Sequence, residues 1–369
     1  MRVFHIPTRI IHGEGAFEKF AAEPVFEGKR VGLFLSASVF ERYPEVRAFC
    51  DMVEKVAHEC VREFVRSGEP DLAETERLRR VIEERDLGHV AAIGGGSVLD
   101  AAKAACGTAW SPYTLEEHFF HAEPLPKRKV VFTAVPTTAG TGTEVTPNAV
   151  LSEPEKGVKQ SLRGKTLYPD TAVVDPALTR GQPMHVAASS GADALVQAIE
   201  AYFSRHSSPI TDALALEGVK LCAGALEDAV LRDDRDARRR MCTGSLMAGM
   251  AFANSRLGAV HGVVHPVGVL TGAPHGVCCA VFMPHVLELN REAAPEKYDV
   301  LERLFGEDPV EHLKALFKKV DLPADLKDFG LDPALFPKMA ASCMMSGSLR
   351  ANPREMTEEM LVELFEKVL

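Results

Sequence analysis

The sequence of 369 residues lacks the signals of a membrane or secreted protein. No stretch has the roughly 20 consecutive apolar residues that cross a bilayer as a helix. The N-terminal residues include no charged leader followed by a long apolar segment, so we expect no signal peptide. These absences favour a cytoplasmic protein that does not bind a membrane.

Clustered positive charge is also scarce. Asp and Glu number 52 against 42 Lys and Arg, which gives a net charge of −10. Binding to nucleic-acid phosphates requires clustered Lys and Arg. The basic run at residues 235–240 is interleaved with Asp and is typical of a solvated helix face. The composition therefore argues against a nucleic-acid partner.

Cysteines with metal-binding or disulfide spacing are missing as well. The eight cysteines include no C-x-x-C pattern, and Cys278 and Cys279 are adjacent in an apolar run. We interpret all eight as reduced thiols, most of them in the core, in a reducing compartment.

The first half of the chain alternates between strand and helix patterns. Short apolar runs typical of buried strands occupy residues 30–35, 60–65, 89–93, 130–135 and 171–174. Helical patterns occupy residues 49–58, 71–85 and 98–105. Strands that alternate with helices predict a mostly parallel sheet covered on both faces.

The pattern changes near Asp175-Pro176, after which we find no convincing strand. The helical segments that follow are 187–202, 210–223, 237–254, 277–289, 295–304, 309–318 and 357–368. We therefore predict two domains: an α/β N-terminal domain with a parallel sheet, residues 1–180, and an all-α C-terminal domain, residues 181–369.

A run of three glycines joins a predicted strand to a predicted helix. Gly94, Gly95 and Gly96 precede Ser97, and the missing side chains let a pyrophosphate approach backbone N–H groups. Ser97 could cap the helix and Asp100 could close a capping box, but capping does not require three consecutive glycines. The motif predicts a dinucleotide-binding loop, although it departs from the usual G-x-G-x-x-G pattern.

A second loop supports this interpretation. Residues 136–144 follow a predicted strand and carry five hydroxyl or carboxylate side chains without a bulky residue. Such a loop can offer hydrogen bonds to a ribose, a phosphate or a carboxamide. The alternative is a flexible connector.

A carboxylate and three histidines form the second chemical pattern. Asp193 and Gln197 are four residues apart, as are His261 and His265, so each pair lies on one face of a helix. His275 follows among turn-forming residues, and we expect it on a turn. These ligand types predict a divalent-metal site in the helical domain. Together with the glycine loop, the site indicates metal-assisted hydride transfer.

Taken together, the motifs resemble those of the iron-containing (group III) alcohol dehydrogenases, in the dehydroquinate synthase-like superfamily. The matching segments are Gly94-Gly-Gly-Ser97, Pro136-Thr-Thr-Ala-Gly-Thr-Gly142, Val173-Val-Asp-Pro176, Gly191-Ala-Asp-Ala-Leu195, His261-x3-His265-Pro-x-Gly-x6-His275-Gly276 and Asn352-Pro-Arg354. The resemblance covers nearly the whole chain. It implies an NAD(P)-dependent alcohol dehydrogenase or aldehyde reductase that acts on small molecules and forms a homo-oligomer, commonly a dimer.

The resemblance also implies a metal held by one Asp and three His, which match Asp193, position 197, His261 and His275. The chain departs from the family at Gln197, whose neutral amide is a weaker ligand than imidazole. Related glycerol dehydrogenases hold zinc with one Asp and two His, so the remaining three ligands imply an open site for Fe²⁺ or Zn²⁺. His265 is implied to lie beside the nicotinamide and to relay a proton.

For the cofactor, the resemblance places the pyrophosphate over the glycine loop and matches Lys159 to a lysine on the nicotinamide side. NAD-preferring members have Thr-Asp after the strand at 30–35, whereas this chain has Ser36-Ala-Ser38 and no carboxylate to repel a 2′-phosphate. This favours NADP, with NAD or the use of both still open. The expected cofactor-binding residues are Ser36, Ser38, Gly94, Gly95, Gly96, Ser97, Asp100, Thr137, Thr138, Thr141 and Lys159.

Arg256, a little over one helical turn before His261, stands where a small residue is more common in the family. It is either a surface or interface residue or a clamp for an anionic substrate group.

Three other functions remain as alternatives. A metal-free reductase of the maleylacetate reductase type would not need Asp193, His261 and His275. A lyase of the dehydroquinate synthase type would need more Lys and Arg near the metal than the sequence offers. A non-catalytic cofactor-binding homologue is favoured only by Gln197.

Overall fold

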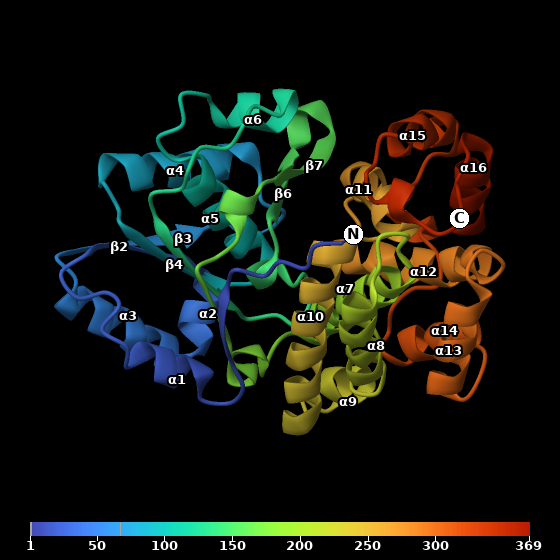
Figure 1. Cartoon of the computed structure of the whole chain (residues 1–369), viewed down its shortest axis with the longest axis horizontal. Helices are drawn as coiled ribbons and strands as arrows, with labels where there is room; N and C mark the ends of the chain where they lie inside the picture. The colour runs from blue at the N-terminus through green and yellow to red at the C-terminus, as the bar shows by residue number, and fades with distance from the viewer. Residues whose placement is uncertain (1, 67) are drawn as a thin grey trace. The chain divides into compact units, whose positions relative to one another are not determined.

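The computed structural model describes residues 2–66 and 68–369, which form two compact units (Figure 1). The N-terminal unit comprises residues 6–138 and 143–180. The C-terminal unit comprises residues 181–369, together with residues 2–5 and 139–142.

A six-stranded parallel sheet forms the centre of the N-terminal unit, in the order β1-β8-β5-β4-β2-β3. The strands are β1 (Arg9–His12), β2 (Arg30–Ser36), β3 (Glu59–Val65), β4 (His89–Gly94), β5 (Val131–Pro136) and β8 (Thr171–Val174). All five predicted strands are confirmed within two residues at each end. The sequence did not predict β1, because its two apolar residues lie between Arg9 and His12 and do not form a buried apolar run.

A separate antiparallel pair, β6 (Asn148–Glu153) and β7 (Val158–Arg163), was also not predicted. Its strands mix polar and apolar residues without the buried run that marked the parallel strands.

Helices cover both faces of the parallel sheet, as the sequence predicted (Figure 1). Alternating strand residues face opposite ways, so Leu33 and Leu35 of β2 join a core with α1 and α3, whereas Phe34 joins a core with α4 and α5. The helices of this unit are α1 (Ala16–Ala21), α2 (Ala37–Arg42), α3 (Pro44–Val56), α4 (Leu72–Glu84), α5 (Gly96–Thr108) and α6 (Leu115–His121).

The strand order gives the sheet a topological switch point between β2 and β4. From β2 the chain moves outward to β3, then crosses back to β4 on the other side of β2 and continues to β5. In such sheets, ligands bind outside the carboxyl ends of the strands at the switch point. Residues 94–97 and residues 36–38 both follow strands at this edge.

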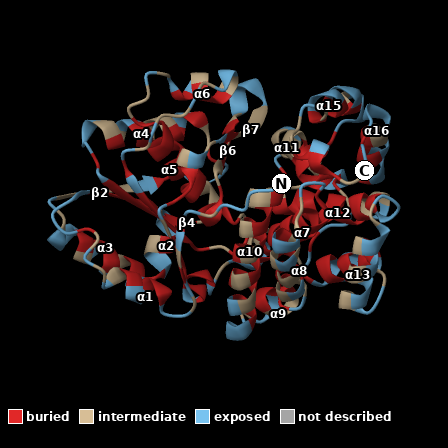
Figure 2. Cartoon of the chain, viewed as in Figure 1, coloured by how far each residue is buried: buried red, intermediate tan, exposed pale blue. Residues whose placement is uncertain are grey.

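The described residues of the C-terminal unit form helices and no strand, which confirms the predicted class. Its helices are α7 (Met184–Phe203), α8 (Pro209–Ala223), α9 (Leu226–Leu231), α10 (Arg235–Ser255), α11 (Ala259–Thr271), α12 (His275–Arg291), α13 (Pro295–Phe305), α14 (Pro309–Lys319), α15 (Phe336–Cys343) and α16 (Glu358–Lys367). α7 lies at the centre and is buried along most of its length (Figure 2).

Small residues allow α7, α8 and α10 to pack closely. A Cβ atom on Gly218 of α8 would lie 3.2 Å from the carbonyl oxygen of Gly244 on α10 and 3.4 Å from Cβ of Ala198 on α7. A larger residue at this crossing would push the three helices apart. This packing fixes α7, which carries Asp193.

Among the described residues, no helix has both the length and the apolar character needed to cross a membrane. All eight cysteines are free thiols, and all but Cys60 are buried, as expected from the sequence.

Candidate functional site

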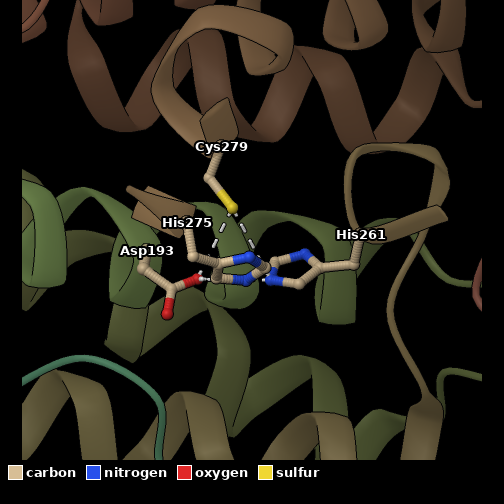
Figure 3. A group of neighbouring side chains, drawn as sticks. All are labelled: Asp193, His261, His275 and Cys279. Carbon is tan, nitrogen blue, oxygen red and sulfur yellow. Dashed lines mark hydrogen bonds and ion pairs between the residues drawn. The ribbon is translucent and has the colours of Figure 1, made fainter. Parts of the chain in front are cut away.

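Four side chains of the C-terminal unit bring possible metal ligands together (Figure 3). They are Asp193 on α7, His261 on α11, and His275 and Cys279 on α12, and one ligand atom from each lies within 4.8 Å of the others. Nε2 of His261 lies 3.2 Å from Oδ1 of Asp193, and Nε2 of His275 lies 3.8 Å from the same oxygen. The structure therefore brings together three of the four expected metal-site residues, Asp193, His261 and His275, and adds a thiol that the sequence analysis assigned to the core.

His275 begins α12, so the expectation that it lies on a turn was wrong. Pro274 is the N-cap, and the helix continues through His275 and Cys279, which are four residues apart and share a face. The next residue, Gly276, has no room for a side chain, because a Cβ atom there would overlap the backbone carbonyl of Ser189 on α7. This close approach holds α12 against α7, the helix that carries Asp193.

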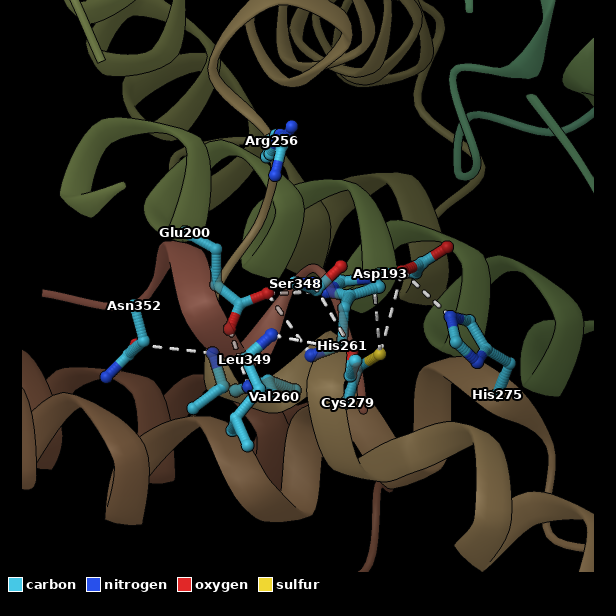
Figure 4. Close-up of polar contacts among 12 residues, drawn as sticks. Asp193, Glu200, Arg256, Val260, His261, His275, Cys279, Ser348, Leu349 and Asn352 are labelled. Carbon is cyan, nitrogen blue, oxygen red and sulfur yellow. Dashed lines mark hydrogen bonds and ion pairs between the residues drawn. The ribbon is translucent and has the colours of Figure 1, made fainter. Parts of the chain in front are cut away.

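Glu200, which the sequence analysis missed, orients His261 (Figure 4). Its carboxylate lies 2.6 Å from Nδ1 of His261 and also accepts the backbone N–H groups of Val260 and His261 at the start of α11. Nδ1 is thus directed at Glu200 and Nε2 at Asp193, which is the arrangement of metal-binding histidines. Asp193, Gln197 and Glu200 are spaced i, i+4 and i+7, so the helical period carried a signal for Glu200.

Asn352 secures the same helix end. Its side-chain oxygen accepts the backbone N–H of Ala259 at 3.2 Å, and its amide pairs with Asn290 of α12 at 2.7 Å. Asn352 therefore connects the beginning of α11 to α12, and both helices carry ligand atoms.

The donor set fits a divalent cation. Asp193 is 3% exposed, and among the described residues its carboxylate has ion-pair partners in His261 and His275 but in no Lys or Arg. A buried carboxylate without a cationic partner is costly. The amide oxygen of Gln197, one turn along α7, is also buried and has no hydrogen-bond partner in the described part of the chain. A bound cation would satisfy both groups.

Electrostatics at His261 follow from its crowded surroundings. Burial lowers its pKa, but Cys279 and the carboxylates of Asp193 and Glu200 outweigh burial, so the pKa is raised well above its usual value. The pKa of Cys279 is raised to about 12, chiefly by burial. The cluster thus attracts positive charge, whether it comes from a proton or from a metal ion.

His275 gives the cluster its exposed side. Its side chain is 21% exposed, whereas those of Asp193 and His261 are 4% and 5% exposed. His265, one turn after His261, is half-buried and stacks on His275 with ring centroids 5.5 Å apart. His265 is outside the group of four ligand atoms, and it lies at the accessible edge of that group.

In the N-terminal unit, the predicted nucleotide-binding residues gather at one edge of the sheet. Gly94 ends β4 opposite Pro136 of β5, and Leu35 of β2 lies opposite Ile93, so Ser36, Gly94 and Thr137 are close in register. The hydroxyl oxygens of Ser36 and Ser38 lie 3.0 Å apart. This edge is where the topology places a ligand.

The glycine loop has a tight turn and an uncapped helix start. Gly95 is the N-cap of α5, and no side chain caps the helix. The expected capping box of Ser97 and Asp100 was therefore wrong. N–H groups in the first turn of such a helix can bind an anion. A Cβ atom on Gly94 would lie 2.7 Å from Val98, so the turn also requires glycine for packing.

Asp100 belongs to a buried network in the N-terminal unit instead. Its carboxylate accepts the Thr143 hydroxyl and the backbone N–H of Val150, and it lies 3.9 Å from Nζ of Lys103. These bonds occupy the carboxylate, so they favour a supporting role over direct cofactor contact. Lys159 forms an ion pair with Glu69 at 2.7 Å. Its expected role near the nicotinamide stays a prediction.

The loop after β5 is shared between the units. Thr137 and Thr138 belong to the N-terminal unit, whereas Thr141 lies in the segment 139–142 that belongs to the C-terminal unit. Gly142 has φ +58° and lies so close to α10 that a Cβ atom would be 2.7 Å from Cα of Gly249. Glycine is therefore required in this loop by both conformation and packing.

Arg256 lies apart from the metal cluster (Figure 4). It ends α10 with φ 65°, its side chain is exposed, and its charge lowers the pKa of His206, although burial of His206 contributes more. Among the described residues its guanidinium forms no ion pair. This placement favours the surface interpretation over the anion clamp.

Comparisons with known proteins agree with the fold. The profile described as iron-containing alcohol dehydrogenase matches residues 7–176, and that of the family's C-terminal domain matches residues 187–369. Lactaldehyde reductase of Escherichia coli is 35% identical over 298 residues, covering 77% of this chain and 78% of that protein. The chain therefore belongs to the iron-containing alcohol dehydrogenase family, and it is an oxidoreductase that acts on alcohols and aldehydes.

Two solved structures show the same architecture. An iron-containing alcohol dehydrogenase from Thermococcus thioreducens has a TM-score of 0.90 and 32% identity, with 99% of both chains covered. A sulfoacetaldehyde reductase from Bifidobacterium kashiwanohense, in complex with NAD⁺, has a TM-score of 0.88 and 27% identity, covering 100% of this chain and 98% of that one.

Proposed function

We propose that this protein is a metal-dependent, NAD(P)-linked dehydrogenase that interconverts a small alcohol and its aldehyde. The observation that carries the proposal is the convergence of ligand atoms from Asp193, His261 and His275 around the buried Asp193 carboxylate, which has no Lys or Arg partner among the described residues. Such a group fits Fe²⁺ or Zn²⁺. Gln197 would add a weaker oxygen from the same face of α7.

In this proposal, the N-terminal unit binds the cofactor and the C-terminal unit binds the metal ion. Gly95, Gly96 and Ser97, at the start of α5, hold the pyrophosphate of the cofactor with backbone N–H groups. Ser36 and Ser38 offer hydroxyls to the adenosine side, and the absence of a carboxylate there favours NADP(H). Because a solved relative binds NAD⁺, both cofactors belong in the test.

When bound, the nicotinamide carries the hydride, and the divalent ion supplies Lewis acidity to the oxygen of the alcohol or carbonyl group. Asp193, His261 and His275 would hold and orient the ion, and Glu200 keeps Nε2 of His261 directed at it by accepting a hydrogen bond from Nδ1–H. His265, at the accessible edge beside His275, moves the hydroxyl proton to and from solvent. His265 is therefore not expected to bind the metal ion.

The test compares metal content with the oxidation of NADPH and NADH by neutral and anionic aldehydes, with and without added Fe²⁺ or Zn²⁺. We expect about one ion per chain and oxidation that depends on it. In the His265→Ala variant, we expect kcat to fall by roughly 10²-fold or more while metal content is unchanged.

Each contrary result supports a different alternative. Turnover without metal would support a metal-free reductase, and cofactor binding without turnover on any aldehyde would support a non-catalytic homologue. Loss of the metal from His265→Ala would contradict the role given to His265.

A further inference from the structure

We propose that Cys279 is the fourth protein ligand of the metal ion. The proposal rests on the function proposed above and goes beyond it by changing the ligand set to one carboxylate, two imidazoles and one thiolate. Cys279 Sγ lies 3.6 Å from Oδ1 of Asp193 and 3.9 Å from Nε2 of His261 (Figure 3). It thus belongs to the same group of converging atoms as the two histidines.

These separations match the edges of a coordination tetrahedron. Bond lengths of about 2.0 Å to N or O and about 2.3 Å to S put tetrahedral ligands roughly 3.3 Å apart for N and O, and roughly 3.5 Å apart when one is S. Four of the six separations, at 3.2, 3.6, 3.8 and 3.9 Å, fall at or slightly beyond these edges, and the other two, from His275 to His261 and to Cys279, are within 4.8 Å. A small inward movement of the side chains would close the tetrahedron around an ion.

The helix geometry explains why the thiol arrives there. Cys279 is four residues after His275 on α12, so the two side chains project from one face of that helix. Gly276 lets this face approach α7 and Asp193. Cys278, the neighbouring residue, points elsewhere: its Sγ lies 3.9 Å from the carbonyl oxygen of Ala273.

Gln197 makes the thiol chemically significant. At position 197 the chain offers an amide oxygen, a neutral and weak ligand, while Cys279 offers a strong anionic ligand once deprotonated. A thiolate is soft and favours Zn²⁺ over harder divalent ions. Cys279 would therefore compensate for the weak ligand at position 197 with a donor of different charge and softness.

Cobalt is the probe for this ligand set, because thiolate coordination to Co²⁺ gives a near-ultraviolet charge-transfer band that carboxylate and imidazole ligands do not give. The experiment titrates the metal-stripped full-length protein, its Cys279→Ser variant and its Cys278→Ser variant with Co²⁺. It then measures Zn²⁺ affinity by competition with a chelator. Cys278→Ser is the matched control, because it removes an adjacent buried thiol outside the ligand group.

We expect the band to reach its full intensity at one Co²⁺ per chain in the wild type and in Cys278→Ser, and to be absent in Cys279→Ser. Zn²⁺ affinity should fall at least about tenfold in Cys279→Ser, since even residues behind the ligands contribute that much. One bound Co²⁺ without the band in the wild type would overturn the role of Cys279 and leave the proposed function standing. No bound ion at all would overturn the proposed function itself. Because the wild-type spectrum is decisive alone, a misfolded variant does not weaken the test.

Discussion

The two units bury ionisable groups in opposite ways. In the N-terminal unit, Lys103 is fully buried, and its ammonium group donates hydrogen bonds to Thr143, Thr146 and Asn148 beside the carboxylate of Asp100. In the C-terminal unit, the carboxylates of Asp193 and Glu200 are buried with imidazoles as their only ion-pair partners among the described residues. The first network contains its own Lys cation, whereas the second has no Lys or Arg and takes its positive charge from a bound proton or from a metal ion.

This difference separates a structural network from a binding site. Burial lowers the pKa of Lys103 to about 8, against the attraction of Asp100, and the backbone carbonyls around it supply the remaining partners. In the acidic cluster, by contrast, the ligand atoms converge on one another, and no Lys ammonium group lies among them. The chemistry of the family is therefore expected at the second cluster, and stability at the first.

The largest effects on turnover and on stability are expected when one carboxylate in each network is replaced by an amide. Asp193→Asn should abolish metal binding and lower turnover by roughly 10³-fold, because metal Lewis acidity supplies several kcal/mol in the transition state. Asp100→Asn should leave metal content unchanged and destabilise the fold by roughly 3–5 kcal/mol, because Lys103 loses its buried partner charge. Metal analysis and urea unfolding measure the two effects. Loss of the metal from Asp100→Asn would contradict the assignment of a purely structural role to the network around Lys103.

Glu200→Gln tests the orientation of His261 with a smaller expected effect. Glutamine keeps one oxygen near Nδ1 but loses the charge that holds the Nδ1 proton, so Zn²⁺ affinity should fall by roughly 10–100-fold. Chelator competition measures this change. Glu217→Gln on the exposed face of α8 is the matched control, and it should leave affinity unchanged. Equal affinities in all three proteins would show that Glu200 only supports the fold.

The smallest effect concerns pH and should be confined to the N-terminal unit. Burial lowers the pKa of His89 from 6.5 to about 4. The unfolded chain therefore takes up a proton on His89 below about pH 6.5 that the folded chain does not, and stability falls as the pH decreases. We expect a loss of about 1 kcal/mol between about pH 7 and about pH 5.5 that His89→Gln abolishes. Urea unfolding at both values measures it, and an unchanged pH dependence in the variant would contradict the assignment.

The sequence predicted the parallel strands and long helices because their apolar periodicity is strong. It did not predict β1, β6 and β7, which are short or mixed in polarity and owe their structure to pairing. The capping box also failed, because the Asp100 carboxylate bonds to Thr143, which lies far from it in the sequence. Tertiary contacts of this kind leave no mark on local spacing.

Three of the four converging residues could be predicted from the sequence. Cys279 could not, because His275 was assigned to a turn. Because His275 was expected on a turn, its spacing of four residues from Cys279 had no meaning until α12 was seen to begin at His275. Glu200 carried a helical signal with Asp193, yet its role depends on α11 beginning at its carboxylate. Whether Gln197 binds the ion depends on how the cluster closes, which spacing does not determine.

The acidic cluster of the C-terminal unit is expected to bind a divalent cation. Calorimetric titration of the metal-stripped protein with Zn²⁺ measures this binding. We expect one ion per chain and, at Zn²⁺ concentrations about 100-fold above Kd, a stabilisation of about 2.7 kcal/mol in unfolding experiments. Absence of binding, or binding that persists unchanged in Asp193→Asn, would contradict it.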